Sequence, residues 1–404
     1  MVKKPYSQVN SINIINWDAV HYKFIKENGY NVDKAGGDYI FAFFPLFPFI
    51  WRILNLPSLG IIFLNYIFFA ISLIILLKLF TDKNKFFHYL LISLCLPSII
   101  IFFIPYSEAT FLIVVSIGVY GFVKNKYWLF FIGFFLASIT RPAYTILGLA
   151  IISTELIYFI KEKKIVTTLK NIIFRLMPLI FGMIAVIIIQ YLQGSKSIFK
   201  FIEVQKYWDN TLKIPTRIAD WSHEGFAINI GVIVLIFFPL VYSVIKDIIK
   251  SLRDKNNSIV ITEKHNYLLV LSAIYIIGAT LFILLFRGGS LHCLFRFTLC
   301  TPFAYILLFK AHEYIKISNK SKVIIFYSLA FICILLLSTI GYSRRWNFSD
   351  FGILLMISTA YLWLFQERYN YRFYKILLVI ILYFNILWTT YLFNSYINNS
   401  WIFA

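Results

Sequence analysis

Charged residues are scarce in this sequence, and acidic residues are the scarcest. Only 14% of the 404 residues are charged, and 18 Asp and Glu stand against 38 Lys and Arg. A soluble domain needs far more polar surface, so the composition excludes an ordinary globular protein. With 60% hydrophobic residues and a mean hydropathy of +0.79, the chain has the composition of an integral membrane protein.

Signals of several other protein classes are missing. The four cysteines form no CxxC pair and Cys293 stands alone in a short loop, so neither a disulfide framework nor a cysteine metal site is indicated. Residues 1–16 lack the apolar core of a cleavable signal peptide. The sequence shows no short strands alternating with amphipathic helices and no glycine-rich phosphate loop, which excludes a soluble nucleotide-binding domain.

Long apolar runs fill most of the chain, and many approach the length that crosses a bilayer. A backbone in lipid must satisfy its hydrogen bonds internally, so these runs predict helices. We expect an all-α polytopic membrane protein, a bundle of roughly twelve transmembrane helices that forms a single domain over residues 1–404. The expected crossings are 57–80, 86–105, 107–123, 127–140, 143–160, 171–192, 226–245, 266–286, 296–309, 322–341, 351–365 and 375–393.

Basic residues are spread among the short loops instead of gathering on one face, which argues against nucleic-acid binding. The positive-inside rule places the basic loops near 78–85, 124–126, 161–164, 246–255, 310–320 and 368–375 in the cytoplasm. Alternating the crossings then puts the remaining loops outside. These are a first outer loop at 17–50, a large outer loop at 193–225, and shorter loops at 105–108, 287–295 and 342–350.

Short motifs follow one another on this outer side. They are WDAVHY at 17–22, FAFFPLFP at 41–48, YSEA at 106–109, TRP at 140–142, and RF at 296–297 followed by TP at 301–302. Their order and wording resemble those of the PIG-V family, the GPI mannosyltransferase II family with its bacterial relatives, and the resemblance runs from Trp17 to about Tyr305.

The resemblance implies a GT-C glycosyltransferase, a multi-helix membrane enzyme that takes a sugar from a polyprenyl-phosphate carrier on the extracytoplasmic face. It further implies an inverting mannosyltransferase in a bacterial cytoplasmic membrane, with a glycan or a lipid as acceptor. Members usually carry a membrane helix before the WD motif, whereas residues 1–16 here are too polar to span. We therefore expect the chain to begin outside, or its true start to lie upstream.

Asp18 is the candidate catalytic base for such a transfer. A carboxylate in the first outer loop, beside Trp17 and close to the bilayer, can accept the proton of an acceptor hydroxyl while the anomeric carbon develops positive charge. The other reading is structural, because Asp is favoured at helix N-caps.

Arg141 and Arg296 are the candidate phosphate ligands, since guanidinium groups match phosphate oxygens bidentately and stay charged. Interfacial snorkelling is the competing interpretation. Glu108 starts a helix, where it suits the positive end of the dipole, and it can orient the sugar or pair with an arginine.

The remaining candidates for substrate binding are weaker. His21 lies one helical turn after Asp18, and Tyr22 follows it in the same motif. Gln205 and Trp208 in the large outer loop can line a sugar site, although loop packing is the stronger explanation for each. No cofactor is indicated, and a DxxH pair is poor ground for a divalent metal.

A transporter or lipid-glycan flippase is the alternative class, because it shares the many helices and the charges within them. Such a protein should show repeated halves with paired broken helices, and the sequence shows no such repeat. A non-catalytic assembly subunit is a third possibility, against which the intact acidic motif argues.

Overall fold

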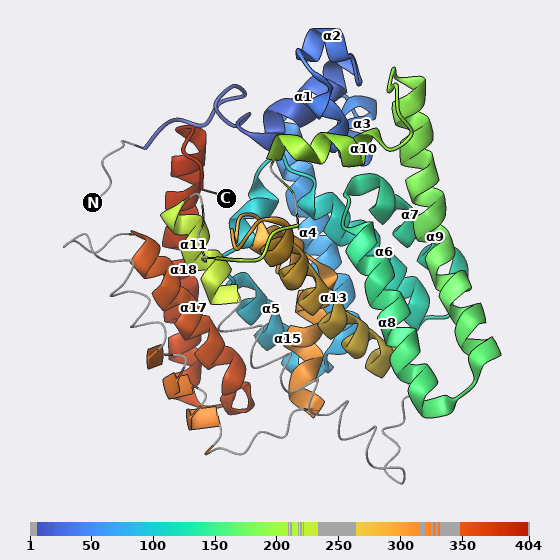
Figure 1. Ribbon diagram of the computed structural model, residues 1–404. Helices are drawn as coiled ribbons and strands as arrows, with labels where there is room; N and C mark the ends of the chain where they lie inside the picture. Colours follow the sequence, from blue (N-terminus) through green and yellow to red (C-terminus); the bar gives the residue numbers. More distant parts are fainter. Residues whose placement is uncertain are drawn as a thin grey trace.

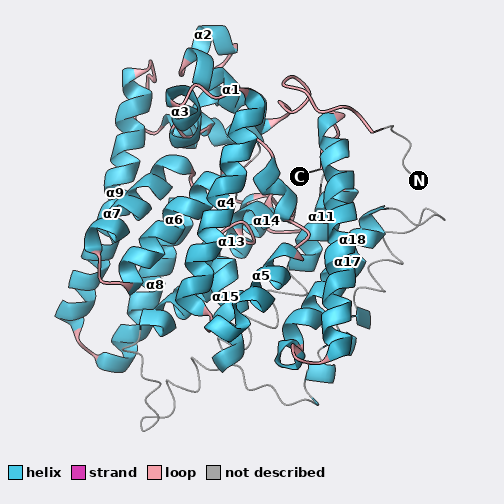
Figure 2. Cartoon of the chain, turned by 180° about the vertical axis from the view of Figure 1, so that it is seen from behind, coloured by secondary structure: helices cyan, strands magenta, loops and turns pink. Residues whose placement is uncertain are grey.

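The computed structural model describes residues 6–402 except 209, 211, 217, 219, 221, 233–263, 315–319, 321, 325, 329 and 332–347. Within these residues the chain is helical and contains no strand (Figure 2). The short elements in or next to the expected outer loops 17–50, 193–225 and 287–295 are α1 (Asp18–Asn28), α2 (Val32–Ala35), η1 (Asp38–Ala42), α3 (Leu46–Ile53), α10 (Lys200–Glu203), η4 (Val204–Trp208) and α14 (Leu294–Phe297). The other described elements are α4 (Ser58–Phe80), η2 (Lys83–Lys85), α5 (Phe86–Leu94), η3 (Ile99–Phe103), α6 (Glu108–Val123), α7 (Tyr127–Thr140), α8 (Tyr144–Glu162), α9 (Ile165–Leu192), α11 (His223–Gly231), α13 (Lys264–Phe286), α15 (Pro302–Tyr314), α17 (Phe348–Leu364), η6 (Gln366–Arg368) and α18 (Arg372–Ile397).

Four of these helices, α4, α9, α13 and α18, are long and apolar enough to cross a membrane. Four shorter apolar helices, α6, α7, α8 and α17, accompany them. The all-helical membrane architecture expected from the sequence is therefore present, whereas the expected number of crossings is not established. The expected crossings at 226–245 and 322–341 lie partly outside the described residues.

Two of the expected crossings are not continuous helices. The segment 86–105 divides into α5 and the 3-10 helix η3, with Pro97 between them, because proline cannot continue the hydrogen-bonded ladder. The segment 296–309 divides in the same way into α14 and α15, which begins at Pro302. Both breaks place irregular backbone inside the bundle.

Buried amides satisfy the backbone carbonyls that the first break leaves without helical partners. Asn65 of α4 donates to the carbonyls of Ile104 and Tyr106 at 2.7 and 3.0 Å. Asn385 of α18 donates to the carbonyls of Leu94 and Leu96 at 2.8 and 3.3 Å. Unpaired carbonyls are costly away from water, so these amides fix the path of the chain into α6.

Helices α6 and α7 pack closely along their length because glycine occupies their contact. A Cβ atom on Gly133 would lie 2.4 Å from the backbone nitrogen of Gly118, and one on Gly121 would lie 2.3 Å from the backbone nitrogen of Phe130. Small residues allow this approach, as they do in membrane helix pairs. The contact holds the start of α6 beside the end of α7, where Glu108 and Arg141 lie.

The helices alternate in direction between two ends of the bundle, as the topology prediction requires. Parts of two segments expected outside, 17–50 and 193–225, meet at one end, where Figure 1 shows α1, α2, α3 and α10 together. Tyr30 donates its backbone N–H to Gln193, and Asp38 pairs with Lys200 at 2.6 Å. At the other end, Lys264 binds the carbonyl of Phe122.

We expect the end that carries α1 to face outward. In a cysteine-free background, single cysteines at the exposed positions Glu27 and Lys196 should react with an impermeant thiol reagent added to intact cells. A cysteine at the exposed position Lys163 should react only after the cells are opened, because the basic loops stay in the cytoplasm. Labelling of the Lys163 position alone in intact cells would show that the predicted topology is inverted.

Candidate functional site

Asp18 is the first residue of α1, and its carboxylate does not cap that helix. The N-cap position is Trp17, with φ of 56°, and it makes no capping hydrogen bond through its side chain. The Asp18 carboxylate instead forms an ion pair with the Nη2 of Arg296 at 2.8 Å, and 22% of the Asp18 side-chain surface is exposed. The capping explanation is therefore not what the structure shows, and the carboxylate points to the centre of a charged cluster.

Arg296 lies in α14 and joins the two carboxylates of this cluster. Its Nε donates to Oε1 of Glu108 at 2.5 Å while its Nη2 binds Asp18. Its guanidinium lies over the ring of Tyr106, 4.9 Å from the centroid, and its Nη1 contacts the Sγ of Cys293 at 3.6 Å. Arg296 is buried, so these contacts hold it in one orientation.

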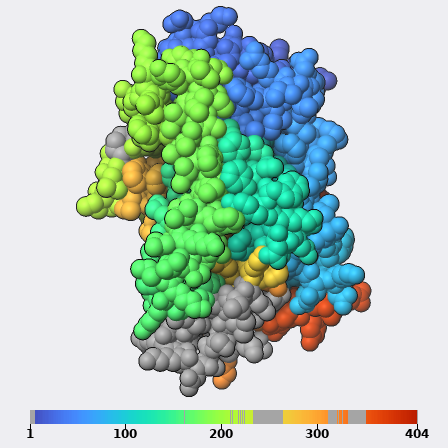
Figure 3. Space-filling model, turned by 90° about the vertical axis from the view of Figure 1, so that its right-hand side faces the viewer, coloured from blue at the N-terminus to red at the C-terminus, as the bar shows by residue number. Residues whose placement is uncertain are grey.

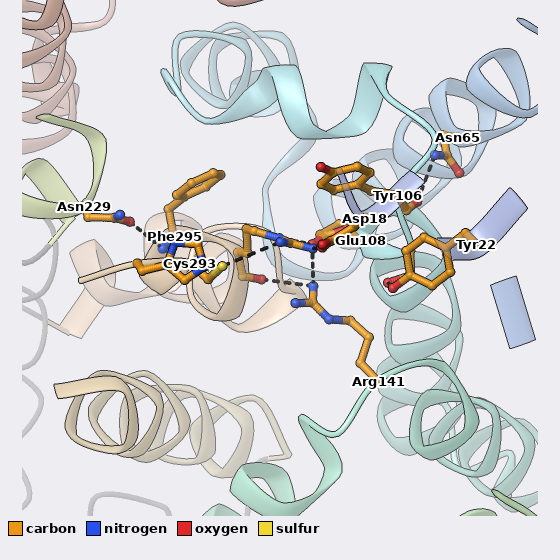
Figure 4. Close-up of polar contacts among 12 residues, drawn as sticks. Asp18, Tyr22, Asn65, Tyr106, Glu108, Arg141, Asn229, Cys293 and Phe295 are labelled. Carbon is orange, nitrogen blue, oxygen red and sulfur yellow. Dashed lines mark hydrogen bonds and ion pairs between the residues drawn. The ribbon is translucent and has the colours of Figure 1, made fainter. Parts of the chain in front are cut away.

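Arg141 completes the cluster from the end of α7. Its Nη1 lies 3.0 Å from the same Glu108 oxygen and donates to the carbonyl of Arg296 at 3.3 Å. Its guanidinium also lies 4.7 Å from the ring centroid of Phe297. Figure 4 shows Asp18, Glu108 and Arg141 converging between α-helical segments that are far apart in the sequence.

Glu108 begins α6 as predicted, and it is completely buried. Its Oε1 forms ion pairs with both arginines, while its Oε2 has no hydrogen-bond partner among the described residues. Two carboxylates and two guanidiniums cancel in formal charge. Both arginines that the sequence offers as phosphate ligands thus already have carboxylate partners.

A cavity of about 130 Å³ opens onto this cluster. It is formed by residues from the expected outer loops 17–50, 193–225 and 287–295, together with residues at the end of α7, in and beside α14, and near the end of the chain. Its lining residues are Asp18, Tyr22, Ala42, Phe43, Phe44, Thr140, Arg141, Pro142, Gln205, Trp208, Asn210, Arg287, His292, Cys293, Arg296, Phe297 and Trp401.

Most of the residues proposed from sequence to bind substrate are placed around this cavity. Tyr22 lines it and shares a hydrogen bond of 2.9 Å with Ser107. Gln205 and Trp208 line it from η4, and Gln205 accepts a hydrogen bond from Asn210. His21 does not line it, because its ring packs against Phe43 at 4.5 Å between centroids.

Arg287 is the cation that the sequence reasoning missed. It lines the cavity from the loop after α13, and its Nη1 donates to the carbonyl of His292 at 3.2 Å. Within the described part of the chain, no carboxylate pairs with it. Its position in the predicted outer loop 287–295 was the available signal, but it lies outside the resembling motifs.

The two histidines near the site are held neutral. Burial lowers the pKa of His292 to about 2, and the positive charges of Arg287 and Arg296 act in the same direction. Burial also lowers the pKa of His21, although the Asp18 carboxylate opposes the shift. Both imidazoles are therefore uncharged at neutral pH, so they can donate or accept hydrogen bonds but do not add to the cationic charge of the site.

The described residues contain no group of three His, Cys, Asp or Glu side chains that could hold a metal ion. The site is a charged, aromatic-walled cavity at one end of a helical bundle that has four membrane-length helices. No protein-family profile, curated protein or solved structure matches the chain.

Proposed function

We propose that the protein is an inverting glycosyltransferase that moves a sugar, preferably mannose, from a polyprenyl-phosphate carrier to a glycan or lipid acceptor. The observation that carries the proposal is the Asp18 carboxylate, which is partly exposed in the cavity and fixed by Arg296. The resemblance to PIG-V segments supports it, since all five of these segments contribute residues to the cavity or the cluster.

Asp18 would act as the base in this reaction. An acceptor hydroxyl attacks the anomeric carbon of the donor, a new C–O bond forms, and the bond from that carbon to the phosphate oxygen breaks. The hydroxyl proton passes to Asp18, and the electron pair of the broken bond leaves with the carrier phosphate. Arg296 keeps the carboxylate in the orientation that such a transfer needs.

Arg287 is better placed than Arg296 to hold the carrier phosphate. Arg296 binds Asp18 and Glu108, so a phosphate would have to displace a carboxylate to reach it. Among the described residues, the hydrogen-bond partner of Arg287 is the neutral carbonyl of His292, and Arg287 lines the same cavity. A guanidinium without a carboxylate partner gains most from a dianionic or monoanionic ligand. We therefore propose Arg287 as the main ligand of the carrier phosphate, ahead of Arg141 and Arg296.

Replacing this guanidinium should weaken donor use without unfolding the protein. We expect Arg287→Gln to raise the KM for the carrier-linked sugar by about tenfold or more, the size of a lost charge-assisted hydrogen bond. Its melting temperature should stay near that of the unaltered protein, because Gln can still donate to the His292 carbonyl. Arg52→Gln, at an exposed arginine of α3, is the matched control. An unchanged KM in Arg287→Gln would remove Arg287 from the donor site.

A transporter or lipid-glycan flippase is the alternative that the buried charged cluster also favours. The two functions differ in what happens to the lipid-linked sugar. We expect purified protein to retain such a lipid and to release the free carrier phosphate when an acceptor is supplied. Movement of the intact lipid-linked sugar across vesicles, with no release of carrier phosphate, would favour the flippase.

A further inference from the structure

A second and larger cavity, of about 430 Å³, lies at the opposite end of the bundle. It is separated from the Glu108 cluster by about 20 Å, the rise of α6 from Glu108 to Phe122. We propose that this cavity binds the phosphate of an anionic phospholipid headgroup. The proposal does not rest on the glycosyltransferase function.

Arg175 of α9 forms the fixed wall of the cavity. It makes an ion pair with the buried carboxylate of Glu155 in α8. Its guanidinium also lies 4.1 Å from the ring centroid of Tyr267 and 5.1 Å from that of Phe122. These contacts hold a planar cation at the cavity surface and leave its charge balanced by Glu155.

Lys264, at the start of α13, provides the second cation of the cavity. Its Nζ donates to the carbonyl of Phe122 at 2.6 Å and to the side-chain oxygen of Asn125. Both partners are neutral, and no carboxylate among the described residues pairs with Lys264. An ammonium with neutral partners in a partly buried site can still bind an anion strongly.

Basic residues surround the mouth of this cavity. Lys124 and Lys126 are exposed on either side of the lining residue Asn125, and Lys163 and Lys164 are exposed just after the lining residue Glu162. Basic pockets between membrane helices bind anionic headgroups in the cytoplasmic leaflet. The positive-inside rule places this end in that leaflet. A volume of this size is also in the range of small-ligand sites, about 300–1,000 Å³.

The wall formed by α9 distinguishes a lipid from a soluble phosphate. Phe174 lines the cavity and is 45% exposed, and Ile173 beside it is 63% exposed. Figure 3 shows α9, in green, running along this face of the molecule. Acyl chains attached to a bound headgroup would lie along this apolar surface, whereas a free phosphate would gain nothing from it.

The test is native mass spectrometry of the full chain after delipidation and titration with phosphatidylglycerol. We expect one tightly bound lipid, with affinity reduced about tenfold in Lys264→Gln and retained in Lys264→Arg, which keeps the charge. Asn171→Phe should also reduce binding, because the larger side chain fills the cavity and leaves every charge in place. Lys78→Gln, at an exposed lysine of α4 at the same end, is the matched control.

Titrations with phosphatidylethanolamine and with inorganic phosphate identify the ligand. Weaker binding of phosphatidylethanolamine, and no measurable competition by inorganic phosphate, are expected for an anionic lipid site. An equal loss of affinity for phosphatidylglycerol in Lys264→Gln and Lys78→Gln would overturn the proposal. So would tight, Lys264-dependent binding of inorganic phosphate that phosphatidylglycerol does not displace.

Discussion

Replacing Asp18 by Asn should reduce sugar transfer by about 10²- to 10⁴-fold, the contribution typical of a general base. Asn has the shape of Asp and can still occupy the space beside Arg296, but it cannot accept the acceptor's proton. The loss should therefore appear in kcat, measured as sugar transferred per minute by purified protein in detergent or vesicles.

The control for this variant is Asp33→Asn, because Asp33 is an exposed carboxylate of α2 close to the same end. It should keep full activity. Asp18→Asn should elute as a folded protein and retain donor binding. Near-normal turnover in folded Asp18→Asn protein would end the assignment of Asp18 as the base.

Replacing Arg296 by Met should have the largest effect on stability. The partly exposed Asp18 would lose its arginine partner, and the buried Glu108 would keep Arg141 but lose its buried pair with Arg296. Removing one side of a buried ion pair typically destabilises a protein by about 3–5 kcal/mol. We expect a loss of that size in the free energy of unfolding, measured by denaturant titration of the purified protein.

A second substitution shows whether the uncompensated charge is the cause. Adding Glu108→Gln to Arg296→Met removes a carboxylate along with its cation, so the double variant should regain part of the lost stability. The stability of Arg296→Lys should lie between those of the unaltered protein and Arg296→Met, since an ammonium keeps the charge but cannot bind both carboxylates as a fork. Purely additive losses in the double variant would show that packing, and not charge, explains the effect.

The sequence predicted several helices well because bilayer-length apolar runs leave little choice of structure. The expected segment 57–80 corresponds to α4 at Ser58–Phe80, and 127–140 corresponds to α7 at Tyr127–Thr140. The breaks at Pro97 and before Pro302 were missed as boundaries. Hydropathy does not distinguish a continuous helix from two short ones whose carbonyls are satisfied by distant amides such as Asn65.

The sequence analysis named the four members of the charged cluster and offered a pairing of Glu108 with an arginine, but it did not predict the pairing of Asp18 with Arg296. Asp18, Glu108, Arg141 and Arg296 were each identified from short motifs, and all four meet in one cluster. Which arginine faces which carboxylate depends on the approach of α6, α7 and α14, and on glycine contacts that no single motif encodes. Arg287 could not be ranked as a phosphate ligand without that pairing. Arg296 has two carboxylate partners, whereas no carboxylate among the described residues pairs with Arg287.

The most direct test of the proposed transfer is a reconstituted assay that compares two donors. Purified protein in vesicles receives an acceptor together with either polyprenyl-phosphate mannose or a nucleotide-linked mannose, with no other carrier present. Transfer from the polyprenyl-phosphate sugar alone, lost in Asp18→Asn, is the predicted result. Turnover with the nucleotide sugar in the complete absence of polyprenyl carrier would contradict the proposed mechanism.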